Sequence, residues 1–287
     1  MLAKFLKKTV VAVITIPILF VLLYLGGWWL LLPVMGVALV GMDEYYTATR
    51  RKGHRPSPML GYVTGIMILG VTHFSPPELR EGTLLAFIIL LVGGALALQF
   101  GNRPDQSAVN NSAITAFGVI YVPLMLSFII RLRQIDLPLV LGHTEALEFW
   151  HRAGAVLFVM VPVWCCDTVA MAVGGAWGRH KLAPTISPAK TVEGSVAGFV
   201  AAIIGGLAVG VWGVGMPWYH ALILGAFEGV VGQLGDLGKS VLKRDIGVKD
   251  FGTLFGAHGG VLDRLDSMMS CLPPVYLYLW LFFGAGR

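Results

Sequence analysis

Residues 232–266 combine the three kinds of residue that chemistry on phosphates requires. The cations of this segment are Lys239, Lys243, Arg244 and Lys249, and its carboxylates are Asp236, Asp245, Asp250, Asp263 and Asp266. Cations bind phosphate, carboxylates bind divalent metals, and recurring glycines let backbone N–H groups come close to a phosphate. The combination favours phosphoryl or nucleotidyl transfer. The alternative is an ordinary cationic loop with salt bridges, and it does not account for the cost of so many charges beside apolar segments.

A shorter pattern in this segment imitates the end of a P-loop. Gly238-Lys239-Ser240 has the right last three residues, but the motif requires a glycine where this chain has Gln233. The residues that precede the pattern form an apolar segment rather than a predicted strand. We therefore exclude a Walker A nucleotide site.

A second polar segment, residues 167–194, joins two apolar runs. Asp167 lies inside the first run, where a carboxylate indicates either a functional group or a polar contact between helices. Ser187-Pro188 is expected to start a turn. The residues that then lead into the second run are Lys190, Thr191, Glu193 and Gly194. Hydroxyls and a lysine beside a helix N-terminus are suited to binding an anion.

The composition places both segments in a membrane protein. Of the 287 residues, 56% are hydrophobic and 13% are charged, and the mean hydropathy is +0.76. Because a soluble domain has about 25% charged residues, an ordinary soluble enzyme, a disordered chain and a nucleic-acid-binding module are excluded. The three cysteines, of which Cys165 and Cys166 are adjacent, provide no disulfide framework.

A helix that crosses a bilayer needs about 20 mostly apolar residues. Nine segments come close to this length, so we expect an all-α, polytopic integral membrane protein with about nine transmembrane helices. The segments are residues 10–25, 28–42, 59–74, 84–100, 113–130, 154–175, 195–214, 220–234 and 267–283. The first resembles a signal peptide, but no small-x-small cleavage site follows it, so we expect it to be retained.

The basic residues predict the orientation of the chain. With the N-terminus inside, 16 of the 21 Lys and Arg residues lie in inner segments and 5 in outer ones. The side richer in Lys and Arg is the cytoplasmic one, so the N-terminus and both polar segments should face the cytoplasm. Residues 131–152 fit least well, because this outer segment is long and carries three arginines; it is either a loop or an amphipathic surface helix.

The two halves of the chain differ in their ionisable residues. Residues 1–150 are expected to form N-terminal transmembrane helices with almost no ionisable group inside them. Residues 151–287 are expected to form the catalytic transmembrane region with cytoplasmic motif loops, because carboxylates within apolar segments indicate function. These carboxylates are Asp167, Glu228, Asp236, Asp263 and Asp266.

One long motif resembles the signature of the phosphatidate cytidylyltransferases, also called CDP-diacylglycerol synthases. The motif is Ser240-x-x-Lys243-Arg244-x4-Lys249-Asp250-x7-His258-Gly259-Gly260-x-x-Asp263-Arg264-x-Asp266. Two upstream patterns match the same family, Gly235-Asp236-Leu237 and Ser187-Pro188-x-Lys190-Thr191-x-Glu193-Gly194. The resemblance covers about residues 155–287, while the N-terminal half matches only as hydrophobic spans. One departure is Ala189, where the family usually has a second lysine.

The resemblance implies that CTP and phosphatidate react at the bilayer to give CDP-diacylglycerol and pyrophosphate for phospholipid biosynthesis. It implies Mg²⁺ as the cofactor, with Asp236 and Asp263 as its ligands. The expected catalytic residues are Asp236, Lys243, Arg244, Lys249, Asp250, Asp263, Arg264 and Asp266. The expected substrate-binding residues are Asp167, Ser187, Lys190, Thr191, Glu193, Gly194, Ser240, His258, Gly259 and Gly260. For His258, a hydrogen bond to phosphate and helix capping at the Gly259-Gly260 bend both stay open.

Two rival functions are weighed against this one. A CTP-dependent lipid kinase would transfer the γ-phosphate and release CDP. An anion transporter could also use broken helices and charges in the membrane, but it predicts mid-membrane charges and repeat symmetry that the sequence lacks. We expect a bacterial inner (plasma) membrane protein, because its loops are short, and no nucleic-acid partner; a homodimer is left open.

Overall fold

The computed structural model describes residues 16–100, 107–135, 145–254 and 259–284, and helices form most of it. The helices are Ile16–Leu25, α2 (Gly27–Arg51), α3 (Pro58–Phe74), α4 (Pro77–Ala97), α5 (Ala108–Val119), α6 (Met125–Gln134), α7 (Glu145–Trp177), α8 (Val192–Leu207), α9 (Trp218–Ile246) and α10 (Leu262–Leu279). The π-helical turns η2 (Ile120–Leu124), η3 (Ala208–Gly213) and η5 (Trp280–Gly284) continue α5, α8 and α10.

The apolar character of these helices confirms the predicted class, an all-α polytopic membrane protein. Among the described residues, seven helices are long and apolar enough to cross a bilayer. The shorter apolar helices are Ile16–Leu25 and Pro58–Phe74. Each of the nine predicted segments overlaps one of these helices, and the number of actual crossings stays a prediction.

A small β-hairpin interrupts the helices, and the sequence did not predict it. Strands β1 (Lys181–Ala183) and β2 (Ser187–Thr191) pair antiparallel, with Lys181 opposite Thr191. The expectation that Ser187-Pro188 starts a turn is wrong, since the turn comes earlier, where the Ile186 N–H donates to the Ala183 oxygen at 3.2 Å. Both strands of a two-stranded sheet are edge strands, so Pro188 can lie in one of them.

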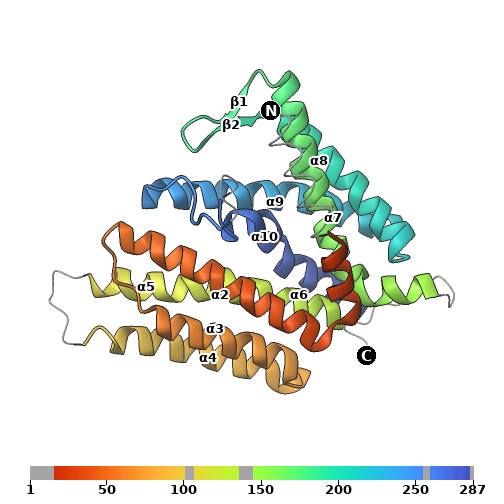
Figure 1. Ribbon diagram of the computed structural model, residues 1–287. Coiled ribbons are helices and arrows are strands. Elements are labelled where there is room, and N and C mark those ends of the chain that lie inside the picture. The colour runs from red at the N-terminus through yellow and green to blue at the C-terminus, as the bar shows by residue number, and fades with distance from the viewer. Residues whose placement is uncertain (1–15, 101–106, 136–144, 255–258, 285–287) are drawn as a thin grey trace.

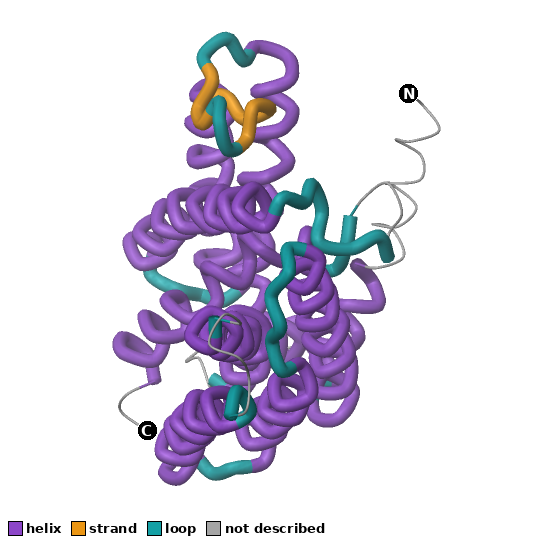
Figure 2. Tube along the Cα trace, turned by 90° about the vertical axis from the view of Figure 1, so that its left-hand side faces the viewer, coloured by secondary structure: helices purple, strands orange, loops and turns teal. Residues whose placement is uncertain are grey.

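Two groups of helices meet along α10 (Figure 1). Helices α2 to α6 lie side by side in one bundle, and α10 packs between this bundle and α9. Helices α7 and α8 cross the bundle direction steeply and lead to the hairpin, which stands at one end of the molecule (Figure 2). The parts of α9 and α10 that carry the long motif therefore lie close to the bundle and to α7 and α8, the helices on either side of the hairpin.

Small residues let α8 approach its two neighbours closely. Gly194, Gly198, Ala202 and Gly206 recur every four residues along one face of α8. A Cβ added at Gly206 would lie 2.8 Å from the Cα atom of Gly225 in α9, and one added at Gly198 would lie 2.8 Å from the backbone oxygen of Cys166 in α7. This small-xxx-small packing is typical of helices in membranes, and it sets the distance between the polar residues of α7 and α9.

Candidate active site

A buried lysine of α9, Lys239, lies at the centre of the polar cluster. Only 6% of its side chain is exposed. Its Nζ atom lies 3.3 Å from Oδ1 of Asp236, contacts the carboxylate of Asp266, and donates to the backbone oxygen of Asp263 at 3.0 Å. The sequence predicted Lys239 as one of the cations of the segment but not as a site residue. The available signal was its i,i+3 spacing from Asp236 on one helix.

Asp236 connects α9 to the hairpin. Its Oδ2 atom lies 2.6 Å from Nζ of Lys190 in β2, and its carboxyl group is within hydrogen-bond distance of Asp266 in α10. Two carboxylates at this distance repel each other unless a proton or a cation lies between them. Lys190 and Lys239 provide positive charge here, so the structure brings together residues from both polar segments of the sequence.

Asp263, in the first turn of α10, holds the loop that precedes the helix. Its Oδ1 atom lies 2.8 Å from Nζ of Lys243. Its Oδ2 atom accepts hydrogen bonds from the backbone N–H groups of Phe251, at 2.9 Å, and Gly260, at 3.1 Å. Gly259, beside it, has a φ of +79°, a conformation that glycine adopts most easily. The predicted residues Asp263, Gly259 and Gly260 thus form one compact turn.

The remaining predicted cations lie on the exposed rim of the cluster. Arg244 donates from Nε to the backbone oxygen of Ile186 at 3.3 Å, which links α9 to the turn of the hairpin. Lys249 and Arg264 are exposed. Asp250 lies 3.8 Å from Lys243 and is about half exposed, and Ser240 is partly buried on α9. These exposed cations are accessible to an anionic ligand that approaches the cluster.

The predicted residues at the start of α8 shape the turn between the hairpin and the helix. Thr191 caps α8, since its Oγ1 atom accepts from the N–H of Gly194 at 3.2 Å. Glu193 accepts hydrogen bonds from the His180 backbone N–H and lies 2.6 Å from its Nδ1 atom. Ser187 begins β2 opposite Ala183. These contacts hold Lys190 in place, while direct contact of these residues with a substrate stays a prediction.

Asp167 lies on α7 beside the cluster. It is exposed on the helix surface and accepts a hydrogen bond from Ser267 of α10. The hydrogen bond to Ser267 agrees with a polar contact between helices. The closeness of Asp167 to Lys190 and Asp236 agrees with a functional role. Both interpretations of Asp167 therefore stay open.

The carboxylates of the cluster are paired with lysines. Asp236 contacts Lys190 and Lys239, and Asp263 contacts Lys243. Within the ranges that the structure describes, no group of three or more His, Cys, Asp or Glu side chains is arranged to hold a metal ion. Of the predicted magnesium ligands, Asp263 lies in the first turn of α10 and Asp236 in the C-terminal half of α9, and their role stays a prediction. His258 lies outside the described residues.

A residue of the N-terminal half reaches this site. The carboxylate of Glu44, on α2, accepts hydrogen bonds from the N–H groups of Val261 and Leu262, both at 3.0 Å. Nearby, Lys52 lies 3.0 Å from Asp245 at the end of α9. Glu44 was not predicted from the sequence, because residues 1–150 were expected to form only transmembrane helices. The only signal was a pair of acidic residues, Asp43 and Glu44, directly after an apolar run.

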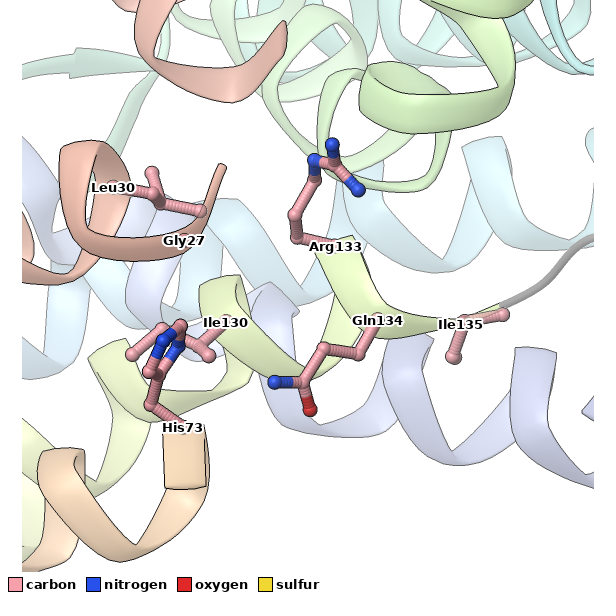
Figure 3. Close-up of a pocket in the computed structure, with 7 residues that line it drawn as sticks. All are labelled: Gly27, Leu30, His73, Ile130, Arg133, Gln134 and Ile135. Atoms are coloured by element: carbon pink, nitrogen blue, oxygen red, sulfur yellow. The ribbon is translucent and has the colours of Figure 1, made fainter. Parts of the chain in front are cut away.

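Figure 3 shows the lining of a cavity of about 360 Å³. It is lined by Gly27, Leu30, His73, Ile130, Arg133, Gln134 and Ile135. Gly27 is the first residue of α2, so the cavity lies at the other end of this helix from Glu44. The guanidinium group of Arg133 already donates hydrogen bonds within the protein, to the backbone oxygens of Leu23 and Tyr24 at 2.6 and 3.1 Å.

A smaller groove of about 330 Å³ lies next to the cluster, between β1, α8 and α9. Its lining is mainly apolar and consists of Leu182, Ser195, Val196, Phe199, Gly229, Val230, Gln233, Leu234 and Leu237. Ser195 and Gln233 bond to each other across the two helices. Because Gln233 and Leu237 flank Asp236 along α9, the groove ends beside the ion pairs.

Comparison with known proteins agrees with the motif. A model of the cytidylyltransferase family matches residues 6–282. A protein of Synechocystis sp. named phosphatidate cytidylyltransferase is 31% identical over 295 residues, which cover 95% of this chain and 96% of the relative. A Staphylococcus aureus protein of the same name is 30% identical over 95% of this chain and 98% of its own length. Residues 6–282 therefore identify the chain as a member of the cytidylyltransferase family.

Proposed function

We propose that the protein transfers the cytidylyl group of CTP to phosphatidate, giving CDP-diacylglycerol and pyrophosphate. The observation that carries this proposal is the cluster of three lysines and three aspartates where the C-terminal half of α9 meets the start of α10 and the end of β2. The relatives that match nearly the whole chain are named for this reaction. A transporter predicts charges in mid-membrane, whereas Asp263 lies in the first turn of α10 and Lys243 in the last turn of α9.

The proposed reaction depends more on cations that stabilise negative charge than on a general base. An oxygen of the phosphatidate phosphate attacks the α-phosphorus of CTP, and this oxygen is already largely anionic at neutral pH. The barrier is the approach of two polyanions, which preorganised cations lower. Lys190, Lys239 and Lys243 are held in place by aspartates. Arg244 and Lys249 are exposed, and we propose that they are the first cations to contact the triphosphate.

We propose that Asp236 and Asp263 hold Mg²⁺, with Asp266 beside them. The observation that supports a fit is that acidic residues of α9 and α10 converge on one cation: Nζ of Lys239 lies 3.3 Å from Asp236, contacts the carboxylate of Asp266 and donates to the backbone oxygen of Asp263. Carboxylate oxygens are also the donors that Mg²⁺ prefers. When bound, Mg²⁺ would screen the triphosphate and stabilise the departing pyrophosphate.

The reaction products test the proposed activity against its rivals. Purified protein is incubated with phosphatidate, Mg²⁺ and CTP labelled at the α- or the γ-phosphate. Cytidylyl transfer puts the α-label into lipid and the γ-label into pyrophosphate. A lipid kinase would put the γ-label into lipid and release CDP, and a transporter would produce neither product.

We infer that the groove between α8 and α9 receives an acyl chain of phosphatidate. Its lining residues Val196, Val230 and Leu234 are exposed on the outside of these helices, where lipid would contact them, and Gln233 and Leu237 of its lining flank Asp236 along α9. Val196→Trp should fill part of the groove and raise the KM for long-chain phosphatidate about 10-fold. A 10-fold change corresponds to the loss of roughly two buried methylene groups of the acyl chain. A soluble short-chain phosphatidate should be less affected by the substitution.

Val200→Trp is the matched control for this experiment, because Val200 is an exposed valine of α8 one turn further along that does not line the groove. Its KM values should stay close to wild type. If both tryptophan variants behave alike, or if glycerol phosphate reacts as well as the lipid, the acyl groove is the wrong assignment.

We propose a bacterial inner (plasma) membrane location with the N-terminus and the site facing the cytoplasm, where CTP is. The distribution of Lys and Arg supports this orientation. Single cysteines at Lys181 and Lys249, both exposed, in a chain lacking the three native cysteines, should resist an impermeant thiol reagent in intact cells. Both should react once the cells are lysed. Labelling of either cysteine from outside would reverse the orientation.

A further inference from the structure

Glu44 is a buried carboxylate at the N-terminus of α10. It lies near the end of α2, and 8% of the residue is exposed. Its Oε1 and Oε2 atoms accept from the backbone N–H groups of Val261 and Leu262, each at 3.0 Å. The first N–H groups of a helix have no partner within the helix, and negative charge is favourable there. Glu44 thus caps α10 from a different part of the chain.

Two glycines of the preceding loop leave room for this carboxylate. A Cβ atom added at Gly252 would lie 2.1 Å from Oε1 of Glu44, and one added at Gly260 would lie 2.2 Å from both carboxylate oxygens. Neither glycine has a positive φ. The space around Glu44, rather than the backbone conformation, therefore excludes a side chain at these two positions.

Glu44 and Asp263 hold the same piece of backbone from two sides. Asp263 binds the N–H groups of Phe251 and Gly260, which are direct sequence neighbours of Gly252 and Val261. Asp263 itself directly follows Leu262, whose N–H group Glu44 accepts. The position of Glu44 is therefore transmitted through one or two peptide units to a carboxylate that contacts Lys243.

We propose that Glu44 is a positioning residue for the transfer reaction. By fixing the first turn of α10, it directs Asp263 toward Lys243 and, one turn later, Asp266 toward Lys239. Glu44 need not touch a substrate for this role. The inference rests on the proposed cytidylyltransferase activity, but the contact between Glu44 and the helix start can be tested without that activity.

Glu44→Gln keeps the size of the side chain but turns one acceptor into an NH2 group that faces an N–H group. We expect kcat to fall roughly 30-fold, since misplacement of a reacting group by about 1 Å costs up to about 100-fold. The KM for CTP should change less than about 3-fold, because the exposed cations are unaffected. Amide hydrogen exchange of residues 259–266 should become faster, and this readout does not depend on activity.

Glu81→Gln is the matched control. Glu81 also serves a buried partner, since its carboxylate binds both terminal nitrogens of Arg131 at 2.8 and 3.3 Å, but Arg131 belongs to α6, away from the lysine cluster. This variant should lower the melting temperature without a comparable loss of kcat. If Glu44→Gln and Glu81→Gln reduce kcat equally, Glu44 supports only the fold.

A double-substitution cycle tests the coupling directly. Gly252→Ala should lower kcat strongly in the wild-type chain, where the new Cβ atom meets Glu44, and much less in a Glu44→Ala background, where that partner is gone. Equal losses in the two backgrounds, or unchanged hydrogen exchange at residues 261 and 262 in Glu44→Gln, would overturn the proposal. A wild-type protein that forms no CDP-lipid would refute the proposed function, while the exchange experiment would still decide the contact.

Discussion

Asp236→Asn and Asp263→Asn should each lower kcat by at least about 100-fold, the scale expected when one preorganised electrostatic contact is lost. Asparagine keeps the size of the side chain but removes the charge that faces Lys190 and Lys239 in one case and Lys243 in the other. The variants should still fold, since Lys239 keeps its contact with Asp266 when Asp236 is changed, and Lys243 keeps Asp250, 3.8 Å away, when Asp263 is changed. The measurement is steady-state formation of CDP-lipid at a series of Mg²⁺ concentrations.

The double variant and a control sharpen this test. Asp236→Asn with Asp263→Asn should be little worse than either single variant, because groups that act as one unit are not additive. Asp245→Asn should be mild, since Asp245 is exposed and pairs with Lys52 outside the cluster. Near-wild-type, Mg²⁺-dependent turnover in Asp263→Asn would contradict its assignment as a metal ligand and leave it as a structural partner of Lys243.

Lys239→Met should remove both activity and a large part of the stability. The substitution leaves the neighbouring carboxyl groups of Asp236 and Asp266 without their shared ammonium group. Breaking a buried charge pair in this way costs about 3 kcal/mol or more of folding free energy. We expect kcat to fall by at least about 100-fold and the thermal unfolding temperature in detergent to drop clearly.

A second substitution separates the two effects of Lys239. Adding Asp266→Asn to Lys239→Met removes the unpaired buried charge, so most of the stability should return. Activity should stay low, because the central cation is still absent. Recovery of turnover together with stability would mean that Lys239 only balances charge and has no part in the reaction.

The helical class could be predicted because a bilayer imposes a simple rule on the chain. Each apolar segment must satisfy its own backbone groups, so long apolar runs become helices almost regardless of their neighbours. The predicted runs 113–130 and 154–175, for example, fall within the helices Ala108–Gln134 and Arg152–Trp177. The hairpin escaped prediction because β1 has three residues and β2 contains Pro188, so neither strand has a periodic pattern.

The composition of the site could be predicted better than its pairing. Charges in and beside apolar segments identified Asp236, Asp263 and Asp266, and the spacing of Lys190 before a helix identified the hairpin's cation. Which lysine faces which aspartate depends on how α9, α10 and β2 pack, and no local spacing contains that information. Glu44 was still harder to find, since its partners are backbone N–H groups that lie 217 and 218 residues away.

The ion pair between Lys190 and Asp236 means that an internal carboxylate competes with a phosphate for the same lysine. Lys190, Lys239 and Lys243 carry three positive charges, and Asp236, Asp263 and Asp266 neutralise them before a nucleotide arrives. In the proposed reaction, nucleotide binding would therefore exchange one counter-ion of these lysines for another. Lys190 and the contact between Arg244 and Ile186 both link the hairpin to α9. We therefore expect a triphosphate that binds Lys190 to weaken one of these links, and departure of pyrophosphate to let the pair with Asp236 re-form.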